Sequence, residues 1–206
     1  MQMLEYLNKN EEEEEKEEKE EKEGHGILNK RMEEIYLQQR RVYFWGVVDD
    51  KSMEKIISKV LFLDAHEPGK EIDLYIRSPG GSVTAGLALL DVMNMIQSPV
   101  NTICMGLAAS MGSMILSQGV KGKRKIFKNG RVMIHQPSIG GVQGQAIELE
   151  ITAKQIVKTR KLLADILAEN CGQPVEKILK DFDRDYWLDA QEAIEYGIVD
   201  EIITKM

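Results

Sequence analysis

The sequence predicts a single α/β domain built around a mainly parallel β-sheet. Short apolar stretches with strand chemistry alternate with longer stretches whose apolar residues recur at helical spacing, from about residue 42 onward. Repeated β–α order is typical of parallel strands covered by helices. The chain has 206 residues, of which 43% are hydrophobic and 6% are aromatic, and this composition suits one tightly packed domain better than a β-sandwich.

The first half of the domain predicts three strands, each followed by a helix. Residues 42–48 (VYFWGVV) form an apolar run, and Ile72, Leu74 and Ile76 alternate with polar residues. Residues 100–105 are a third apolar run, which we expect Gly106 to end. The apolar residues that follow each run recur at helical spacing. The expected helices cover residues 52–65, 84–96 and 110–119.

The second half predicts one long helix among shorter elements. Short strands over residues 125–127 and 132–134 lie on either side of an Asn129-Gly130 turn. A Gly-rich link over residues 138–145 then precedes a helix that runs to about Asn170. The remaining signals are Pro174 at the start of a helix, a capping-box-like start from Asp189 to Glu192, Gly197 as the end of that short helix, and a closing strand over residues 198–203.

The charge is concentrated in an N-terminal arm, residues 1–26, ahead of the predicted domain at residues 27–206. Residues 11–23 hold ten Glu and three Lys, so this segment carries the whole formal charge of −7. Glu–Lys pairs four residues apart would support a solvated helix, and a disordered acidic tail is the alternative. The arm is interpreted as a solubilising or processed leader. A balanced domain with an acidic arm argues against nucleic-acid binding.

Cysteine use and hydropathy predict a cytoplasmic protein without a membrane span. Cys104 and Cys171 form no disulfide framework, which suits a reducing compartment, and the N-terminus shows no secretory signal. Residues 92–120 are uncharged and long enough to cross a bilayer. They contain Pro99, Gly106 and several polar residues, however, so a buried strand–turn–helix is the better interpretation.

Three histidines are the candidates for a base near neutral pH. His25 lies between two glycines near the arm, and His66 lies in a polar stretch at a predicted helix end. His135 differs, because it ends an apolar strand and precedes the Gly-rich link. The ends of strands in α/β sheets are where reactive groups tend to lie. His135 is therefore the preferred candidate, although its position alone does not make it catalytic.

Ser110 is the candidate nucleophile, between a predicted strand and a predicted helix. A hydroxyl at a helix N-terminus lies beside free backbone N–H groups that can stabilise an oxyanion. An ordinary N-cap serine is the simpler interpretation of the same position. The GxSxG motif is absent, so a nucleophile elbow of the hydrolase type is not indicated. The loop Ser78-Pro-Gly-Gly81 could supply a second oxyanion donor or a substrate-binding edge, or it could be a simple strand-to-helix turn. No nucleotide-binding motif and no zinc-ligand spacing occurs.

Several ordered blocks of the sequence resemble the ClpP family, the proteolytic subunits of Clp proteases. The similarity covers about residues 35–204, and its blocks are SPGGSVTAG from Ser78, TICMGLAASMG from Thr102, KGKR from Lys121, VMIHQP from Val132, QGQA from Gln143, DRD from Asp183 and EAIEYG from Glu192. The resemblance implies a crotonase-like (ClpP/crotonase) α/β fold of repeated β-β-α units. It also implies a protruding handle helix at about residues 143–170.

The same resemblance implies a serine endopeptidase of the ATP-dependent Clp type with a Ser-His-Asp triad. Matched residue by residue, Ser110 is the nucleophile and His135 the general base. The acid falls on Asp185 rather than on Asp183 or Asp181. The oxyanion donors would be the backbone N–H groups of Gly81 and Met111. No metal or cofactor is implied for this chain, because ATP is used by the partner unfoldase.

Assembly is the third implication of the resemblance. Members form two stacked seven-membered rings that enclose a chamber, here either of identical chains or together with a paralogous ring. Gln145 and Glu148 would bond across the ring interface to Asp183 and Arg184. A free particle would cleave short peptides, and unfolded proteins would be delivered by an AAA+ unfoldase of the Clp type.

Three features depart from the family pattern, and the first two bear on partner docking. The acidic arm replaces a short apolar axial segment. Asp73 stands where members usually carry an aromatic residue in an apolar docking pocket, although Tyr75 of that pocket is kept. A carboxylate there costs desolvation energy against an apolar anchor. Arg77 replaces an Asn. Docking of the usual unfoldase is therefore in doubt.

Three rival functions fit parts of the sequence. A catalytically idle ring subunit could pair with a more active paralogue, although Ser110, His135 and Asp185 are all present. A crotonase-type enzyme acting on acyl thioesters would share the fold and the oxyanion hole, but it would need neither the serine nor the histidine. A membrane-bound signal-peptide peptidase is disfavoured by the lack of an anchor segment.

Overall fold

The chain divides into two units, residues 1–39 and residues 40–206, and each is described by itself. The computed structural model describes residue 28, residues 30–138, residue 140 and residues 143–205. In the first unit, residues 30–38 are helical. The predicted acidic arm at residues 1–26 and His25 lie outside the described residues. All elements discussed below belong to the second unit.

The second unit is built on a sheet with the strand order β1-β2-β3-β4-β7, in which all neighbours are parallel. The buried side chains of its central strands include Leu74 and Ile76, which have no exposed surface. This arrangement confirms the predicted α/β class. The strands are β1 (Arg41–Trp45), β2 (Ile72–Ser78), β3 (Val100–Ala109), β4 (Lys125–Phe127) and β7 (Glu201–Ile203).

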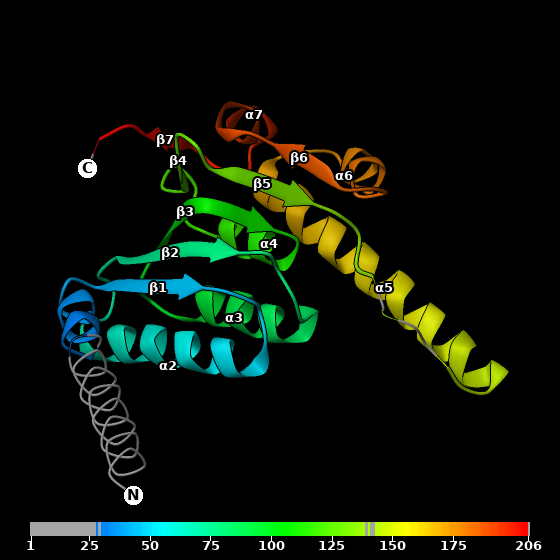
Figure 1. Cartoon of the computed structure of the whole chain (residues 1–206), viewed down its shortest axis with the longest axis horizontal. Helices are drawn as coiled ribbons and strands as arrows, with labels where there is room; N and C mark the ends of the chain where they lie inside the picture. Colours follow the sequence, from blue (N-terminus) through cyan, green and yellow to red (C-terminus); the bar gives the residue numbers. More distant parts are fainter. Residues whose placement is uncertain (1–27, 29, 139, 141–142, 206) are drawn as a thin grey trace, which may run out of the picture. The chain divides into compact units, whose positions relative to one another are not determined.

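Three helices cover one face of this sheet (Figure 1). They are α2 (Asp50–His66), α3 (Val83–Met95) and α4 (Met111–Ser117). Each follows a strand, as the alternation predicts. A capping box of Asp49 and Ser52 begins α2, because the two side chains bond each other's backbone N–H groups. Every residue of α4 is buried, which makes this short helix the centre of the core.

The prediction that Gly106 ends the third strand is wrong. β3 continues to Ala109 and changes its partner on one edge: residues 103–104 pair with β4, and residues 107–109 pair with β5 (Arg131–Ile134). On the other edge β2 pairs with residues 100–104 and again with Ala108. Gly106 has φ +81°, a backbone conformation that glycine adopts without the penalty other residues carry. The glycine therefore bends the strand rather than ending it, and the bend directs β3 toward the site.

The sequence did not predict β6 (Tyr186–Leu188), a strand antiparallel to β5. The strand has three residues, and two of them, Tyr186 and Trp187, are exposed, so it shows no buried alternation. The strands β4 and β5 on either side of Asn129 do not pair with each other, since both pair with β3. The closing strand is shorter than predicted, because Ile198 and Val199 lie buried in the link before β7.

The predicted long helix is α5 (Ala146–Cys171). Figure 1 shows its N-terminal part extending away from the sheet, and no residue from Ala146 to Leu162 is buried. The buried residues begin at Leu163, where the helix reaches the core. Two short helices follow, α6 (Val175–Asp181) and α7 (Ala190–Tyr196), the second with the predicted Asp189–Glu192 capping box and a left-handed Gly197. No helix in the described part of the chain is long and apolar enough to span a membrane.

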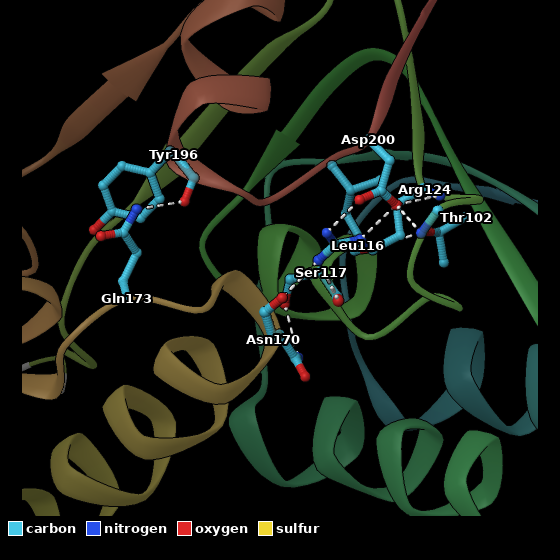
Figure 2. Close-up of polar contacts among 9 residues, drawn as sticks. Thr102, Leu116, Ser117, Arg124, Asn170, Gln173, Tyr196 and Asp200 are labelled. Carbon is cyan, nitrogen blue, oxygen red and sulfur yellow. Dashed lines mark hydrogen bonds and ion pairs between the residues drawn. The ribbon is translucent and has the colours of Figure 1, made fainter.

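A buried polar network joins the ends of α4 and α5 to the sheet (Figure 2). The Arg124 guanidinium donates to the Asp200 carboxylate at 2.6 and 2.9 Å, and to the carbonyls of Ser117 and Asn170 at 3.3 and 2.8 Å. These two carbonyls lie in the last turns of α4 and α5, where helices leave acceptors unpaired. The Arg124 side chain is only 3% exposed. The network therefore fixes the base of the long helix against α4.

Candidate active site

Ser110 lies in a sharp turn between β3 and α4. Its backbone has φ +54° and ψ −124°, in the left-handed half of conformational space that a serine rarely adopts. The turn is held by its hydrogen bonds: the Ser110 N–H donates to the Met133 carbonyl at 2.8 Å, and the Ser113 hydroxyl donates to the Ser110 carbonyl at 2.6 Å. Ser110 holds the N-cap position of α4, but its side chain makes no capping hydrogen bond, so its hydroxyl is not used as that of an ordinary N-cap serine.

The strand register brings His135 and Asp185 together. Ile134 of β5 and Tyr186 of β6 are antiparallel partners, so the next residue beyond each, His135 and Asp185, leave the ladder side by side. Likewise Ala109 pairs with Met133, which puts Ser110 next to the same strand end. Residues separated by 25 and 50 positions in the sequence thus meet at one point.

The three side chains form a continuous hydrogen-bonded chain. Ser110 Oγ and His135 Nε2 are 2.8 Å apart, and His135 Nδ1 and Asp185 Oδ1 are 3.2 Å apart. The His135 side chain is 27% exposed and that of Asp185 is 61% exposed. Ser110 and His135 are therefore half-buried, whereas the acid end of the chain is open to solvent.

Two backbone N–H groups beside Ser110 have no hydrogen-bond acceptor among the described residues: those of Gly81 and Met111. The loop Ser78–Gly81 lies directly against the turn, since a Cβ placed on Gly80 would come within 2.6 Å of Ser110 Cβ and 3.0 Å of the Met111 nitrogen. Glycine is needed at this close approach. The second donor predicted from the glycine pocket therefore lies beside the turn that carries the first.

A small hollow of about 20 Å³ adjoins Ser110 and His135. Most of its lining is apolar, from Val83, Met114, Leu163 and other residues. Its volume is close to that of one water molecule, so side chains must move before it can hold a larger group. The hollow is thus a narrow, apolar extension of the site.

Other candidate groups take no part in this cluster. His66 ends α2 and stacks on Phe62, with ring centroids 5.9 Å apart. Burial raises the pKa of the Cys104 and Cys171 thiols to about 12, which leaves both poorly reactive. Within the described ranges, no group of three His, Cys, Asp or Glu side chains could hold a metal ion.

The four predicted ring-contact residues lie in two separate places. Gln145 and Glu148 form a capping box at the exposed start of α5. Asp183 and Arg184, with side chains 63% and 86% exposed, lie in the link between α6 and β6. No hydrogen bond or ion pair joins the two pairs in the described part of this chain. Both pairs are therefore available to another molecule.

A charged cleft of about 420 Å³ lies over the strands, lined by side chains of β1, β2, β3, β4 and β7. Asp73 lines it together with Tyr75, the two residues singled out in the sequence. The Asn101 amide donates to Asp73 Oδ1 and to Glu71 Oε2, both at 2.9 Å. Glu71 also pairs with Lys123, which lowers the Glu71 pKa. Charges and hydrogen bonds therefore dominate this cleft, where the resemblance implied an apolar docking pocket.

An α/β fold that brings a serine, a histidine and an aspartate into one hydrogen-bonded chain at its strand ends has the arrangement of triad hydrolases. Comparison with known families agrees with that class: the model of the Clp protease family matches residues 25–206. The chain therefore belongs to the Clp protease family, a family of peptidases. The match, together with the mixed sheet and its helices, confirms the ClpP/crotonase-like fold.

Sequence reasoning missed the groups that hold the site in place. They are the Met133 carbonyl, the Ser113 hydroxyl and the backbone of Val48, whose N–H donates to the Gly80 carbonyl at 2.9 Å. Backbone donors and acceptors leave no trace in residue identity. The small residues Ala108, Ala109 and Gly112 around Ser110 are the one signal that a tight turn was required.

Proposed function

We propose that the chain is a serine endopeptidase subunit that cleaves short peptides alone and unfolded polypeptides delivered by an ATP-driven unfoldase. The observation that carries the proposal is the unbroken chain from Ser110 Oγ through His135 to Asp185, at 2.8 and 3.2 Å. The family match supports a peptidase. The two N–H groups beside Ser110 that have no acceptor among the described residues could stabilise the oxyanion that forms during acyl transfer.

The proposed mechanism assigns one task to each group. Asp185 accepts a hydrogen bond from His135 Nδ1–H, which leaves Nε2 as the acceptor for the Ser110 hydroxyl. As Ser110 Oγ attacks the peptide carbonyl carbon, its proton moves to His135, and the carbonyl oxygen takes up the negative charge. The Gly81 and Met111 N–H groups donate to that oxygen. His135 then gives its proton to the leaving amine, and water releases the acyl group by the reverse sequence.

Labelling with a fluorophosphonate tests the proposal. The intact mass of the treated protein should increase by one adduct, and Ser110→Ala should show none. A crotonase-type enzyme has no activated serine and would not react in this way. If assembled protein takes up no adduct, the activity proposed here is wrong, and the idle subunit paired with a paralogous ring becomes the better account.

We propose self-assembly through the exposed half of α5 into stacked heptameric rings. No residue from Ala146 to Leu162 is fully buried in this chain, and several of the apolar side chains in this stretch are about half exposed. Contiguous exposed apolar surface marks an interaction site. Those side chains are Ile147, Leu149, Ile151, Val157 and Leu162. Ile151→Glu should lower the mass of the assembly measured by sedimentation. Lys154→Glu, on the same helix, should leave that mass at its wild-type value.

The charged cleft supports a partner whose docking segment carries a basic side chain. Asp73 forms no ion pair in the described part of the chain, and the buried Asn101 Oδ1 has no hydrogen-bond partner there. An apolar anchor would desolvate the Asp73 carboxylate without supplying a counter-ion and would leave Asn101 Oδ1 without a donor, which costs free energy. A lysine or arginine would satisfy them. The unfoldase partner proposed here would therefore differ from one that docks through an apolar loop.

Two labelled peptides of equal length test this docking chemistry, one with a central lysine and one with a central isoleucine. Fluorescence anisotropy should show tighter binding of the lysine peptide to the wild-type protein, with binding that weakens as salt is raised. Asp73→Tyr should reverse the order. Equal binding of both peptides by both proteins would contradict a charge-selective cleft.

The buried, free cysteines support a cytoplasmic location.

The apolar lining of the hollow beside Ser110 supports cleavage after apolar residues, which would enter once the lining side chains have moved. A fluorogenic peptide with leucine before the scissile bond should be cleaved at least about tenfold faster than one with aspartate, because the hollow offers no cation to pair with a carboxylate. Comparable rates for both peptides would contradict this assignment.

A further inference from the structure

Ser78 is the last residue of β2 and is fully buried, although it takes no part in the proposed chemistry. Its hydroxyl accepts a hydrogen bond from the Gly80 N–H at 3.1 Å. Its Cβ and carbonyl lie against Gly112, where an added Cβ would be 3.0 and 3.1 Å away. Ser78 therefore lies between the glycine loop and the first turn of α4, in contact with Gly80 and Gly112, the neighbours of the two proposed oxyanion donors Gly81 and Met111.

Gly80 is held on both sides. Ser78 Oγ fixes its N–H, and the Val48 N–H fixes its carbonyl at 2.9 Å. Two residues further along the chain, the Ser82 N–H donates to the Val48 carbonyl at 2.7 Å. Between these bonds only the Gly81 N–H has no acceptor in the described part of the chain.

The direction of that free N–H follows from peptide geometry. In a trans peptide the carbonyl and the N–H point in opposite directions, so the Gly81 N–H points away from Val48, which binds the Gly80 carbonyl. Gly80 itself has φ +92° and no side chain, so it can rotate unless it is held. The hydroxyl of Ser78 is the side-chain group that holds the N–H side of Gly80.

We infer that Ser78 is a positioning residue that aims the Gly81 N–H at the developing oxyanion, an inference that rests on the proposed function. Without the hydroxyl, the Pro79–Gly80 peptide loses its fixed orientation and Gly81 loses its alignment. Oxyanion donors act because they are already oriented when the charge develops, so misalignment lowers the rate of acyl transfer more than it lowers substrate binding.

Ser78→Ala in the full chain tests the inference with a matched pair of inhibitors. Ser110 Oγ adds to the carbonyl carbon of a peptide aldehyde, and the serine proton moves to His135. The former carbonyl oxygen of the aldehyde then lies in the oxyanion hole. The corresponding peptide alcohol occupies the same subsites without that bond. Ser78→Ala should lower kcat/KM and the affinity for the aldehyde by the same factor, about ten- to hundredfold, with affinity for the alcohol unchanged.

Ser117→Ala is the control, because Ser117 is a second buried serine, at the other end of α4. Its hydroxyl donates to the Met114 carbonyl at 2.9 Å and accepts from the Asn170 amide at 3.1 Å. Ser117→Ala should lower the melting temperature at least as much as Ser78→Ala and leave kcat and both affinities at wild-type values. The inference is overturned if Ser78→Ala keeps wild-type kcat/KM, or if its affinities for the alcohol and the aldehyde fall together.

The proposed function fails separately, through absence of a fluorophosphonate adduct on the wild-type protein. An adduct on the wild type, together with equal aldehyde affinity in the wild type and Ser78→Ala, would overturn the role of Ser78 alone.

Discussion

Two polar networks of the second unit differ in how completely their hydrogen bonds are used. Around Arg124, the guanidinium bonds a carboxylate and two helix-end carbonyls, and its side chain is 3% exposed. Around Ser110, the chain of bonds ends at Asp185, which is 61% exposed, and two neighbouring N–H groups have no acceptor in the described residues. One network is closed, and the other is open.

The difference separates stability from reactivity. A closed network offers nothing to a substrate, but removal of a member leaves a buried charge unpaired. The open site holds a serine at φ +54° and keeps donors free, which costs stability and suits groups that wait for a substrate. Substitutions in the two networks should therefore have opposite signatures.

The largest expected effect is on activity, at Ser110. Ser110→Ala should lower kcat on a short peptide by a factor on the order of 10⁵, because the proposed nucleophile is lost. The free energy of unfolding should change by less than about 1 kcal/mol, since the hydroxyl makes no structural hydrogen bond besides that with His135. Peptide turnover and urea unfolding measure the two quantities. A large loss of stability would show that the Ser110 hydroxyl belongs to a stabilising network, as the Arg124 side chain does.

The Arg124 network should respond in the reverse manner. Arg124→Met keeps the length of the side chain but leaves the Asp200 carboxylate without its cation, which should cost about 3–5 kcal/mol of stability. Urea unfolding measures the loss. The fraction that remains folded, counted by fluorophosphonate labelling, should keep the wild-type kcat. A fall in kcat per labelled site would couple the two networks and contradict their separation.

Asp185→Asn sharpens the comparison within the open site. The amide can hold His135 only in the wrong tautomer, and in a buried triad this change lowers kcat by about 10⁴. Here the acid side chain is 61% exposed, so water can replace part of its role, and we expect a loss of about 10² to 10³. The measurement is kcat of Asp185→Asn and of the wild type as a function of pH. A loss as large as that of Ser110→Ala would indicate that assembly buries Asp185.

Most of the fold follows from periodicity, because buried strands and amphipathic helices mark their own positions. The exceptions are the bend of β3 at Gly106 and the strand β6. The local preference of Gly106 is to end a strand. Pairing of β3 with β2 on one edge and with β5 on the other nevertheless continues the strand beyond Gly106. β6 exists because β5 offers it an edge, and its exposed Tyr186 and Trp187 show no pattern of burial.

For the site, residue types could be predicted but not their convergence. Local sequence offered Ser110 as an N-cap and His135 as one of three histidines. Their proximity depends on the pairing of β3 with β5 and of β5 with β6, which are contacts distant in the sequence. The unusual φ of Ser110 was also invisible, since the GxSxG motif that signals a strained turn in other hydrolases is absent. The resemblance to the ClpP family supplied what local chemistry could not.

The smallest expected effect is a pH dependence that belongs to the closed network. Burial acts to raise the pKa of Asp200, but hydrogen bonds and the charge of Arg124 outweigh it, so the pKa lies below its ordinary value. A carboxyl whose folded pKa is depressed stabilises the fold above its unfolded pKa, and that stability is lost as pH falls through the folded pKa. The difference in unfolding free energy between wild type and Asp200→Asn should therefore be constant above about pH 5 and should shrink below about pH 4. Urea unfolding of both proteins from pH 7 to pH 3 measures it, and parallel curves over that range would contradict an ionised, Arg124-bound Asp200.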